Sequence, residues 1–200
     1  MATRLFHHDK IDLTWWAGLL SLEDCQQLVQ IGRDHMQEAT VIDEHTGVNV
    51  SDVSRQSQMA WPKREDYQIL QKIAHGIVQL TGVPLECQEP LQILRYSPGG
   101  QYKPHFDAFN ADSPALRAGG NRSLTLILYL NAVEDGGETT FPELGITVYP
   151  LPGSGLLFRN LNAEGVRERF SLHAGNPVTR GEKWIATQWI RQGAYVDAEG

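Results

Sequence analysis

Apolar residues recur at three- and four-residue steps in two segments of the first half of the chain, the pattern of helices with one buried face. The first segment, about 21–38, begins with Ser-Leu-Glu-Asp, which is typical of a capped helix start. The second, about 64–80, ends before a glycine and a proline. The sequence therefore predicts a helical N-terminal layer over about 20–82.

The second half has a different pattern, with short apolar runs separated by Gly- and Pro-containing turns. Such runs favour a β-sandwich or barrel and predict an antiparallel β core over about 88–191. The predicted strands are 91–96, 101–106, 123–130, 145–149, 155–161, 168–173 and 183–190. Two polar stretches without a period, 43–58 and 108–121, are predicted to be long loops. The whole chain, 1–200, is expected to form a single domain.

Composition narrows the class of protein. The 200 residues are 41% hydrophobic and 20% charged, with a formal net charge of −7, which is typical of a soluble globular protein. The acidic balance argues against a nucleic-acid partner, and no apolar run is long enough to predict a membrane helix. The two cysteines, Cys25 and Cys87, are too few for a disulfide framework and are expected to be reduced and packed. Without a signal-peptide pattern, we expect a cytoplasmic protein.

Candidate metal ligands lie at the end of a predicted strand. His105 and Asp107 are two residues apart, so both side chains project from the same face and could meet one ion. The same spacing occurs at 7–9, which we attribute to chance. His173 is a possible third ligand. Two histidines and one carboxylate with open positions are the ligand set of non-haem Fe(II) oxygenases.

A lysine follows the third candidate ligand on the next predicted strand. Lys183 lies among apolar neighbours in a strand expected to belong to the β core. An unpaired buried ammonium is costly, so a lysine that faces the core implies an anionic partner. A dicarboxylate held by the metal at one end and by Lys183 at the other would satisfy both groups.

Four blocks of sequence extend this picture. The first contains Tyr-Ser-Pro-Gly-Gly-Gln-Tyr-Lys-Pro-His-Phe-Asp, and the blocks cover 94–107, 122–142, 173–189 and 41–57. In their order along the chain, with 41–57 first, these four blocks resemble the prolyl 4-hydroxylase branch of the 2-oxoglutarate/Fe(II) dioxygenases over about 20–191. The resemblance implies a mainly β fold, a double-stranded β-helix (jelly roll) with the N-terminal helices packed on one sheet.

The resemblance also implies roles for individual residues. Fe(II) would be bound by His105, Asp107 and His173, which are therefore the predicted catalytic residues. Lys183 would pair with the C5 carboxylate of 2-oxoglutarate, and the hydroxyls of Tyr96 and Thr139 would hydrogen-bond this cosubstrate. O₂ would be the second cosubstrate, and ascorbate is a further expected cofactor because the family commonly responds to it.

The resemblance indicates the residues that contact the substrate less directly than those that bind the metal and the cosubstrate. The positions that line the peptide groove in the family correspond to Arg55, Ser57, Glu89, Tyr102, Arg122 and Trp189. Two departures from the family pattern lie on this side of the site, since Gln56 replaces the usual Thr and Arg191 stands where several members carry His. Both leave the metal chemistry intact and put the identity of the substrate in doubt.

The predicted reaction is hydroxylation of an unactivated C–H bond with conversion of 2-oxoglutarate to succinate and CO₂. The favoured target is a prolyl residue in a peptide or protein, and the alternative is a free amino acid or another small molecule. A different class of function is a non-catalytic jelly-roll metal-binding or sensor protein. The loops 43–58 and 108–121 are candidates for a lid over the substrate. The sequence does not predict an oligomeric state.

Overall fold

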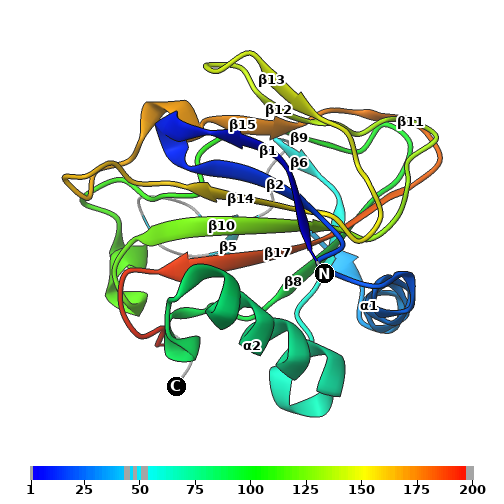
Figure 1. The fold of residues 1–200 in the computed structure, drawn as a ribbon, viewed down its shortest axis with the longest axis horizontal. Helices are drawn as coiled ribbons and strands as arrows, with labels where there is room; N and C mark the ends of the chain where they lie inside the picture. The colour runs from blue at the N-terminus through cyan, green and yellow to red at the C-terminus, as the bar shows by residue number, and fades with distance from the viewer. Residues whose placement is uncertain (1, 43–45, 47–48, 51–53, 197–200) are drawn as a thin grey trace.

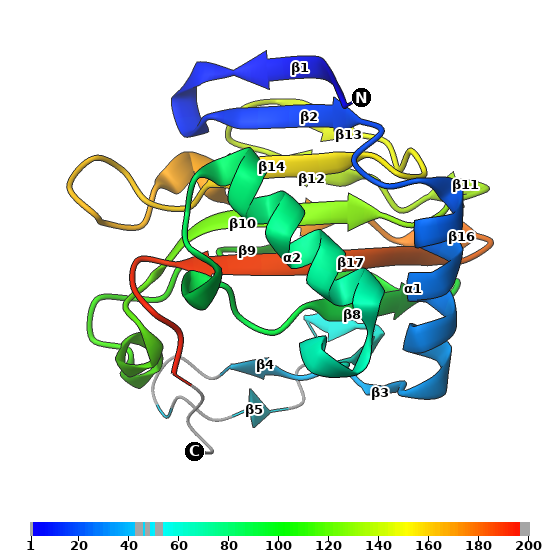
Figure 2. The same cartoon turned by 60° about the horizontal axis from the view of Figure 1, so that its bottom comes forward.

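The computed structural model describes residues 2–42, 46, 49–50 and 54–196 (Figure 1). Two α-helices cover one face of a large antiparallel sheet, and a smaller sheet packs against its other face (Figures 1 and 2). The α-helices are α1 (Leu22–Asp34) and α2 (Gln68–Thr81). Short 3₁₀ helices are η1 (Asp9–Ile11), η2 (Arg64–Asp66), η3 (Leu85–Cys87), η4 (Pro114–Ala118) and η5 (Arg169–Ser171).

The large sheet has eight strands in the order β1-β2-β14-β10-β17-β8-β7-β3. Their bounds are β1 (Thr3–His8), β2 (Leu13–Ala17), β14 (Gly155–Arg159), β10 (Arg122–Tyr129), β17 (Lys183–Arg191), β8 (Gln92–Tyr96), β7 (Gln58–Ala60) and β3 (Gln37–Glu38). The central strand β17 is buried along its whole length, so its side chains alternate between two interiors.

The smaller sheet has five strands in the order β13-β12-β15-β9-β6. Their bounds are β13 (Ile146–Val148), β12 (Thr139–Phe141), β15 (His173–Gly175), β9 (Gln101–His105) and β6 (Arg55–Gln56). Two further pairs complete the described strands: β11 (Asp135–Gly136) with β16 (Val178–Arg180), and β4 (Val41–Ile42) with β5 (Asn49–Val50). This packing of two antiparallel sheets is the predicted jelly-roll arrangement.

The alternation along the central strands produces two separate hydrophobic clusters. One lies between the helices and the large sheet, where Trp184 and Ile190 of β17 pack with Leu28 and Ile73 of the helices. The other lies between the two sheets and includes Ile185 of β17. The functional pocket opens from this second interior, so the helix layer supports the site without lining it.

Local sequence accounts for how the helices end and how closely they approach the sheet. Ser21 and Asp24 form a reciprocal capping box at the start of α1. At Gly32 a Cβ atom would lie 2.8 Å from Ile93 and 2.9 Å from Trp184, so only glycine permits this close crossing. Gly82 ends α2 in the left-handed conformation, with φ of 72°.

Several predicted boundaries were wrong. The first helix ends at Asp34 instead of about residue 38, and the second begins at Gln68 after a separate 3₁₀ turn. In the stretch 168–173, Arg169–Ser171 form the 3₁₀ turn η5, and the strand begins only at His173. Strand β12 was not predicted, because its three residues are too few to show a period.

The N-terminal layer is also less helical than predicted. Within about 20–82, strands β3, β6 and β7 lie between the helices in sequence yet join the two sheets. Ahead of this stretch, β1 and β2, for which no element was predicted, form a hairpin that extends the large sheet. Much of the predicted loop 43–58 lies outside the described residues, and its last part is β6 and the start of β7. The stretch 108–121 is a loop that contains η4.

The cysteine prediction agrees with the structure, since Cys25 and Cys87 are both unpaired and buried. Within the described parts of the chain, neither α-helix has the length and the apolar run needed to cross a membrane.

Candidate active site

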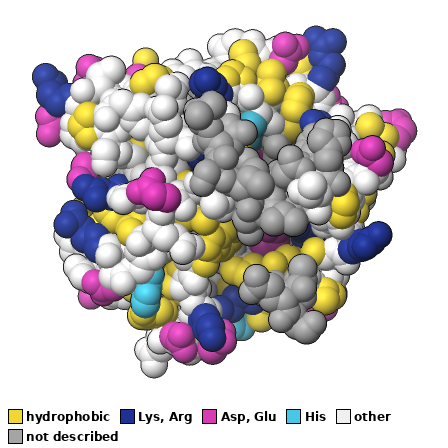
Figure 3. Space-filling model, turned by 180° about the vertical axis from the view of Figure 1, so that it is seen from behind, with side chains coloured by type: hydrophobic (Ala, Val, Ile, Leu, Met, Phe, Trp, Pro, Cys, Tyr) yellow, Lys and Arg dark blue, Asp and Glu magenta, His cyan; other side chains and the backbone are white. Residues whose placement is uncertain are grey.

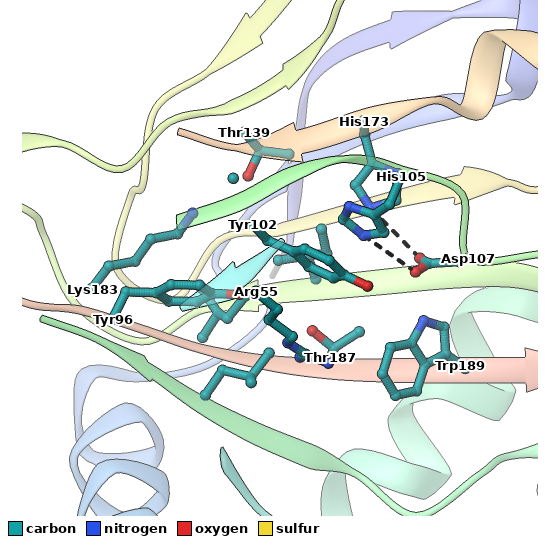
Figure 4. A pocket seen from close by; sticks show the side chains of 14 residues that line it. Arg55, Tyr96, Tyr102, His105, Asp107, Thr139, His173, Lys183, Thr187 and Trp189 are labelled. Atoms are coloured by element: carbon teal, nitrogen blue, oxygen red, sulfur yellow. Dashed lines mark ion pairs between the residues drawn. The ribbon is translucent and has the colours of Figure 1, made fainter. Parts of the chain in front are cut away.

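A pocket lies between the two sheets and is lined by residues from both (Figure 4). Strand β17 contributes alternate residues along the length of the pocket, and β9 and β15 of the smaller sheet contribute the opposite wall. The lining residues are Arg55, Leu94, Tyr96, Tyr102, His105, Asp107, Ile127, Thr139, His173, Gly175, Lys183, Ile185, Thr187 and Trp189.

The three predicted metal ligands meet on one wall of this pocket. His105 and His173 are directly paired across β9 and β15, and Asp107 follows the end of β9. Asp107 Oδ1 lies 3.7 Å from His105 Nε2, and Asp107 Oδ2 lies 3.6 Å from His173 Nε2. All three ligand atoms lie within 4.8 Å of one another. A single ion between them could contact all three side chains.

The backbone fixes which ring nitrogen each histidine offers. His105 Nδ1 lies 2.8 Å from the carbonyl oxygen of Lys103, and His173 Nδ1 lies 2.9 Å from that of Ser171. A carbonyl oxygen can only accept, so each neutral ring carries its proton on Nδ1 and leaves the Nε2 lone pair free. This is the usual outer-shell arrangement of metal-binding histidines.

Asp107 is oriented by a hydrogen-bonded chain from the large sheet. Thr125 Oγ1 of β10 donates to Asp107 Oδ2 at 2.7 Å, and Asn160 Nδ2 donates to the same hydroxyl at 2.7 Å. Thr125 and Asn160 are fully buried. Because Asn160 occupies an acceptor position of the hydroxyl, the hydroxyl proton is directed to the carboxylate. One carboxylate oxygen is thereby held in place while the other stays available.

Aromatic rings enclose the two imidazoles. The ring of Tyr102 stacks on His105 with centroids 3.5 Å apart, and Phe141 and Phe158 pack around His173. Burial and the adjacent His173 lower the pKa of His105 to about 3, so its ring is neutral and can bind a metal. Burial alone would raise the pKa of Asp107, but the two adjacent histidines, Arg122 and the hydrogen bond from Thr125 together hold the pKa below its usual value.

Lys183 lies at one end of the pocket, beside Tyr96, to which it is paired across β17 and β8 (Figure 4). The lysine is 2% exposed, and its Nζ lies over the rings of Tyr96 and Tyr129 at 5.4 Å and 6.0 Å from their centroids. Among the described residues, no acidic side chain forms an ion pair with it. Burial lowers its pKa to about 8, although Glu138 partly opposes the shift. This end of the pocket therefore favours an anion.

Two features beside Lys183 leave room and hydrogen-bonding capacity for such an anion. At Gly175 a Cβ atom would lie 3.7 Å from Lys183 Nζ, so the missing side chain keeps the space in front of the ammonium open. Thr139 Oγ1 lies 2.8 Å from the hydroxyl of Tyr129, and both groups are buried. With the Tyr129 hydroxyl as the donor, Thr139 can donate its own proton into the pocket. These residues fit a dicarboxylate such as 2-oxoglutarate.

Arg55 lines the pocket from β6. Its guanidinium lies 4.8 Å from the centroid of the Tyr102 ring and donates to Gln92 Oε1 at 2.7 Å and to the carbonyl oxygen of Thr40 at 3.2 Å. Its Nε is buried and has no hydrogen-bond partner among the residues that the structure describes. Arg55 thus brings a positive charge and an unused donor to the wall that also carries Tyr102.

Trp189 lies at the other end of the pocket from Lys183 (Figure 4). The guanidinium of Arg122 lies over its indole, and Arg122 donates to both carboxylate oxygens of Glu89, at 2.7 Å and 2.8 Å. Arg191 Nε donates to the same carboxylate at 2.5 Å. The two arginines hold the pKa of Glu89 below its ordinary value against the effect of burial.

Three predicted substrate residues are therefore placed differently from the others. Glu89 and Arg122 form this buried ion-pair network behind Trp189 and do not line the pocket, and neither does Ser57. By contrast, Arg55, Tyr102 and Trp189 do line it. A substrate role for Glu89, Arg122 and Ser57 stays a prediction.

The loop 108–121 is tied to the sheets at several points. Arg191 Nη1 donates to the carbonyl oxygens of Ala115 and Gly120 at 2.9 Å and 2.7 Å. The side chain of Asn121 accepts from the backbone N–H of Phe109 and donates to its carbonyl oxygen. Its predicted role as a lid stays a prediction.

Sequence reasoning missed residues that the strand period could have indicated. Thr187 lines the pocket because it alternates with Lys183 and Trp189 on β17. Thr125 and Tyr129 face the same interior because they are four residues apart on β10, yet their contacts with Asp107 and Thr139 join distant parts of the sequence. No local pattern specifies those contacts.

Comparison with known proteins agrees with this geometry. Residues 91–191 match the model of the 2OG-Fe(II) oxygenase superfamily. Prolyl 4-hydroxylase 1 of Arabidopsis thaliana is 40% identical over 190 residues, which cover 88% of this chain and 67% of the relative. Probable prolyl 4-hydroxylase 3 of the same plant is 34% identical over 197 residues, which cover 89% and 68%.

A solved structure is similar over most of both chains. It is the viral collagen prolyl hydroxylase of Paramecium bursaria Chlorella virus-1 in its 2OG complex, with a TM-score of 0.71 and 28% identity. The match covers 89% of this chain and 94% of the viral chain. With the metal ligands and Lys183 in one jelly-roll pocket, these matches show that the chain belongs to the prolyl 4-hydroxylase family of 2-oxoglutarate/Fe(II)-dependent dioxygenases.

Proposed function

We propose that this enzyme hydroxylates a prolyl residue in a peptide or protein. The relatives that support this substrate are named prolyl 4-hydroxylases, and the viral neighbour is a collagen prolyl hydroxylase. The observation that carries the proposal is the arrangement of three sites in one pocket. Lys183, which would bind the dicarboxylate, lies at one end, His105, Asp107 and His173 lie on the wall, and the aromatic ring of Trp189 lies at the other end.

The metal site would be held by His105, Asp107 and His173, whose two imidazole nitrogens and one carboxylate suit Fe(II). When bound, iron with 2-oxoglutarate and O₂ supplies the oxidation that converts C–H to C–OH and 2-oxoglutarate to succinate and CO₂. Thr125 orients the carboxylate, and the carbonyl oxygens of Lys103 and Ser171 orient the rings. These contacts hold the ligands in place before any metal binds.

The length of β17 separates the cosubstrate from the substrate. Lys183 and Trp189 are six residues apart on this strand, which at the rise of a β-strand corresponds to about 20 Å. Lys183, with Tyr96 and Thr139, would bind 2-oxoglutarate at its own end. Tyr102 and Trp189 present aromatic surfaces that suit the apolar ring of a proline and help exclude water.

The net charge and the distribution of charged side chains favour a peptide over a nucleic acid as the partner. The formal net charge is −7, and on the face shown in Figure 3 acidic and basic side chains are interspersed. A cytoplasmic location stays a proposal, supported by the two buried, unpaired cysteines.

Turnover with a panel of substrates tests the proposal. The protein would be loaded with Fe(II) without oxygen, given 2-oxoglutarate and air, and offered prolyl peptides, free proline and related amino acids. Mass spectrometry would look for a product heavier by one oxygen atom, with succinate measured in parallel. His105→Ala is the control that removes a metal ligand. A parallel series with ascorbate tests the expected response to that reductant.

The outcomes separate the alternatives. An oxygenated peptide product with matching succinate supports the prolyl substrate. Oxygenation of free proline or another small molecule alone would replace it with the small-molecule hydroxylase. Succinate no higher than in the His105→Ala control, with every substrate tried, would favour a metal-binding or sensor protein.

A further inference from the structure

One aromatic ring of the pocket lies directly against the metal ligands. The ring of Tyr102 stacks on the imidazole of His105, with centroids 3.5 Å apart and planes inclined at 16°. Figure 4 shows the hydroxyl end of this ring directed towards Asp107. The ring carbons beside the hydroxyl therefore lie on the side of the ring that faces the predicted metal site.

The ring is held in this position from both faces. The guanidinium of Arg55 lies 4.8 Å from the centroid of the Tyr102 ring. Because the stacked imidazole of His105 fills one face, the guanidinium covers the other. The backbone of Tyr102 is fixed in β9, which pairs with β15 and β6 on its two sides. A group that is fixed beside a reacting centre can compete as an intramolecular substrate, since no free energy is needed to bring it there.

The other aromatic rings that contact the ligands are shielded from the pocket. Phe141 and Phe158 lie 5.6 Å and 5.0 Å from the His173 ring, centroid to centroid, but both are fully buried and neither lines the pocket. Within the described parts of the chain, Tyr102 is the one phenylalanine, tyrosine or tryptophan that both contacts a ligand ring and lines the pocket. An oxidant formed in the pocket would therefore meet this ring first among them.

We propose that Tyr102 is a self-oxygenation site, at which the enzyme hydroxylates its own phenol ring when 2-oxoglutarate and O₂ react without a prolyl substrate. The inference rests on the proposed function, because it uses the same oxidation. The phenol oxygen activates the ring carbons beside it, and those carbons lie on the side of the metal ligands. The product is a catechol side chain at position 102.

The atoms and electrons balance as in the hydroxylation of a substrate. The C1–C2 bond of 2-oxoglutarate breaks and releases CO₂, and one oxygen atom of O₂ enters the carboxylate of succinate. The other oxygen atom forms a C–O bond at the ring carbon, where a C–H bond breaks, and the new hydroxyl carries a proton in place of the ring hydrogen. The ring and 2-oxoglutarate each lose two electrons and O₂ accepts four, so no other reductant is needed.

A bound substrate should protect Tyr102. In the proposed function the apolar ring of a proline packs against Tyr102 and Trp189. A C–H bond of that proline then lies at the reacting position and takes the oxygen atom instead. The site thus excludes the competing reaction only while it is filled. Self-oxygenation would therefore mark those molecules that consumed the cosubstrate without a substrate.

Mass spectrometry of the protein itself tests the inference without depending on product formation. The protein would be loaded with Fe(II) without oxygen, given 2-oxoglutarate and air with catalase present, and digested for peptide sequencing. We expect one added oxygen atom at Tyr102, about tenfold or more above any other tyrosine, because only this ring is fixed beside the ligands. A redox-cycling stain for catechols should detect the same peptide. An excess of a prolyl peptide should suppress the modification.

Matched controls separate this reaction from random oxidation. Tyr149→Phe removes a phenol that is 63% exposed and outside the pocket, and it should leave the modification of Tyr102 unchanged. Tyr102→Phe should remove the catechol stain. His105→Ala, and the wild type given succinate in place of 2-oxoglutarate, should show no oxygen at Tyr102 above the background. Thermal unfolding of each variant checks its folding.

The outcomes distinguish failure of the inference from failure of the proposed function. Succinate formed without a peptide while Tyr102 stays unmodified would overturn the inference, and so would oxygen on another pocket residue or spread over the surface. Turnover of prolyl peptides with no succinate in their absence would also overturn it and leave the proposed function intact. No succinate with any substrate would overturn the proposed function, and self-oxygenation with it. Oxygen confined to Tyr102, dependent on 2-oxoglutarate and suppressed by a prolyl peptide, supports the inference.

Discussion

The guanidinium of Arg122 lies 3.7 Å from the centroid of the Trp189 indole, close enough to fix the ring that ends the substrate side of the pocket. Arg122 is itself held by Glu89, and Glu89 also accepts from Arg191. Arg191 in turn donates to the carbonyl oxygens of the 108–121 loop. The network of Arg191, Glu89 and Arg122, which lies outside the pocket, therefore connects the 108–121 loop to the orientation of Trp189.

Replacing Arg191 with glutamine should weaken substrate binding more than cosubstrate binding. Glu89 keeps its pair with Arg122, but the loop carbonyls lose their donor and the network loses one charge. We expect the KM for the substrate that the enzyme hydroxylates to rise about tenfold. The KM for 2-oxoglutarate should stay within about twofold of the wild-type value. The free energy of unfolding should fall by about 1–3 kcal/mol, as for other lost buried hydrogen bonds.

The matched control is Arg180→Gln. Arg180 pairs with Glu134 on the surface, where both side chains are more than half exposed, so its loss should change little. Equal increases in both Michaelis constants for Arg191→Gln would contradict the connection to Trp189 and indicate a general loss of structure.

Replacing Thr125 with valine should weaken metal binding without removing a ligand. The variant keeps the shape of the side chain but loses the hydrogen bond to Asp107 and the acceptor for Asn160. Loss of such an outer-shell contact typically lowers metal affinity by about 10–100-fold. Anaerobic titration with Fe(II) measures this change. Thr147→Val, on the exposed face of β13, is the control. Unchanged affinity for Thr125→Val would show that the contact does not orient the carboxylate.

Much of the metal site could be predicted from the sequence because its residues lie close together in sequence or on one face of a single strand. His105 and Asp107 are close in sequence at the end of β9 and meet at one site, and Lys183, Thr187 and Trp189 share a face of β17 through the two-residue period of a strand. The short alternating strands and the jelly-roll resemblance together predicted an antiparallel β core. Both can be recognised from the order of residues along the chain.

The parts that could not be predicted depend on contacts between distant residues. Glu89 is polar and follows a short 3₁₀ turn, so its pattern suggests a surface residue, yet two arginines from separate strands bury it. The N-terminal hairpin was missed because β1 is exposed along nearly its whole length and has no apolar alternation. Its place in the sheet is set by pairing of β2 with β14.

Removing the ammonium of Lys183 should abolish tight binding of 2-oxoglutarate. Lys183→Ala leaves the C5 carboxylate of the cosubstrate without its buried partner, a loss of about 3–5 kcal/mol, or about two to three and a half decades in affinity. Anaerobic binding of 2-oxoglutarate to the metal-loaded protein measures it. Lys10→Ala, an exposed lysine outside the pocket, is the comparison. An unchanged dissociation constant would remove Lys183 from the cosubstrate site.

The same lysine should make the stability of the ligand-free protein depend on pH. Burial lowers its folded-state pKa from 10.5 to about 8. Between these values the unfolded chain binds more protons than the folded one, so Lys183 adds stability as the pH rises, by about 3 kcal/mol in total at about 1.4 kcal/mol per unit. Lys183→Met, similar in size and uncharged, should therefore be more stable than the wild type at pH 7.

Urea unfolding of both proteins without metal or cosubstrate, at intervals from pH 7 to pH 10.5, measures this difference. The advantage of Lys183→Met should stay constant below pH 8 and shrink steadily above it, because the wild-type lysine then becomes neutral in the fold. Adding metal and 2-oxoglutarate at pH 7 should reverse the order, since only the wild type gains the ion pair. A difference that does not vary with pH would show that the ammonium of Lys183 is already compensated in the folded protein.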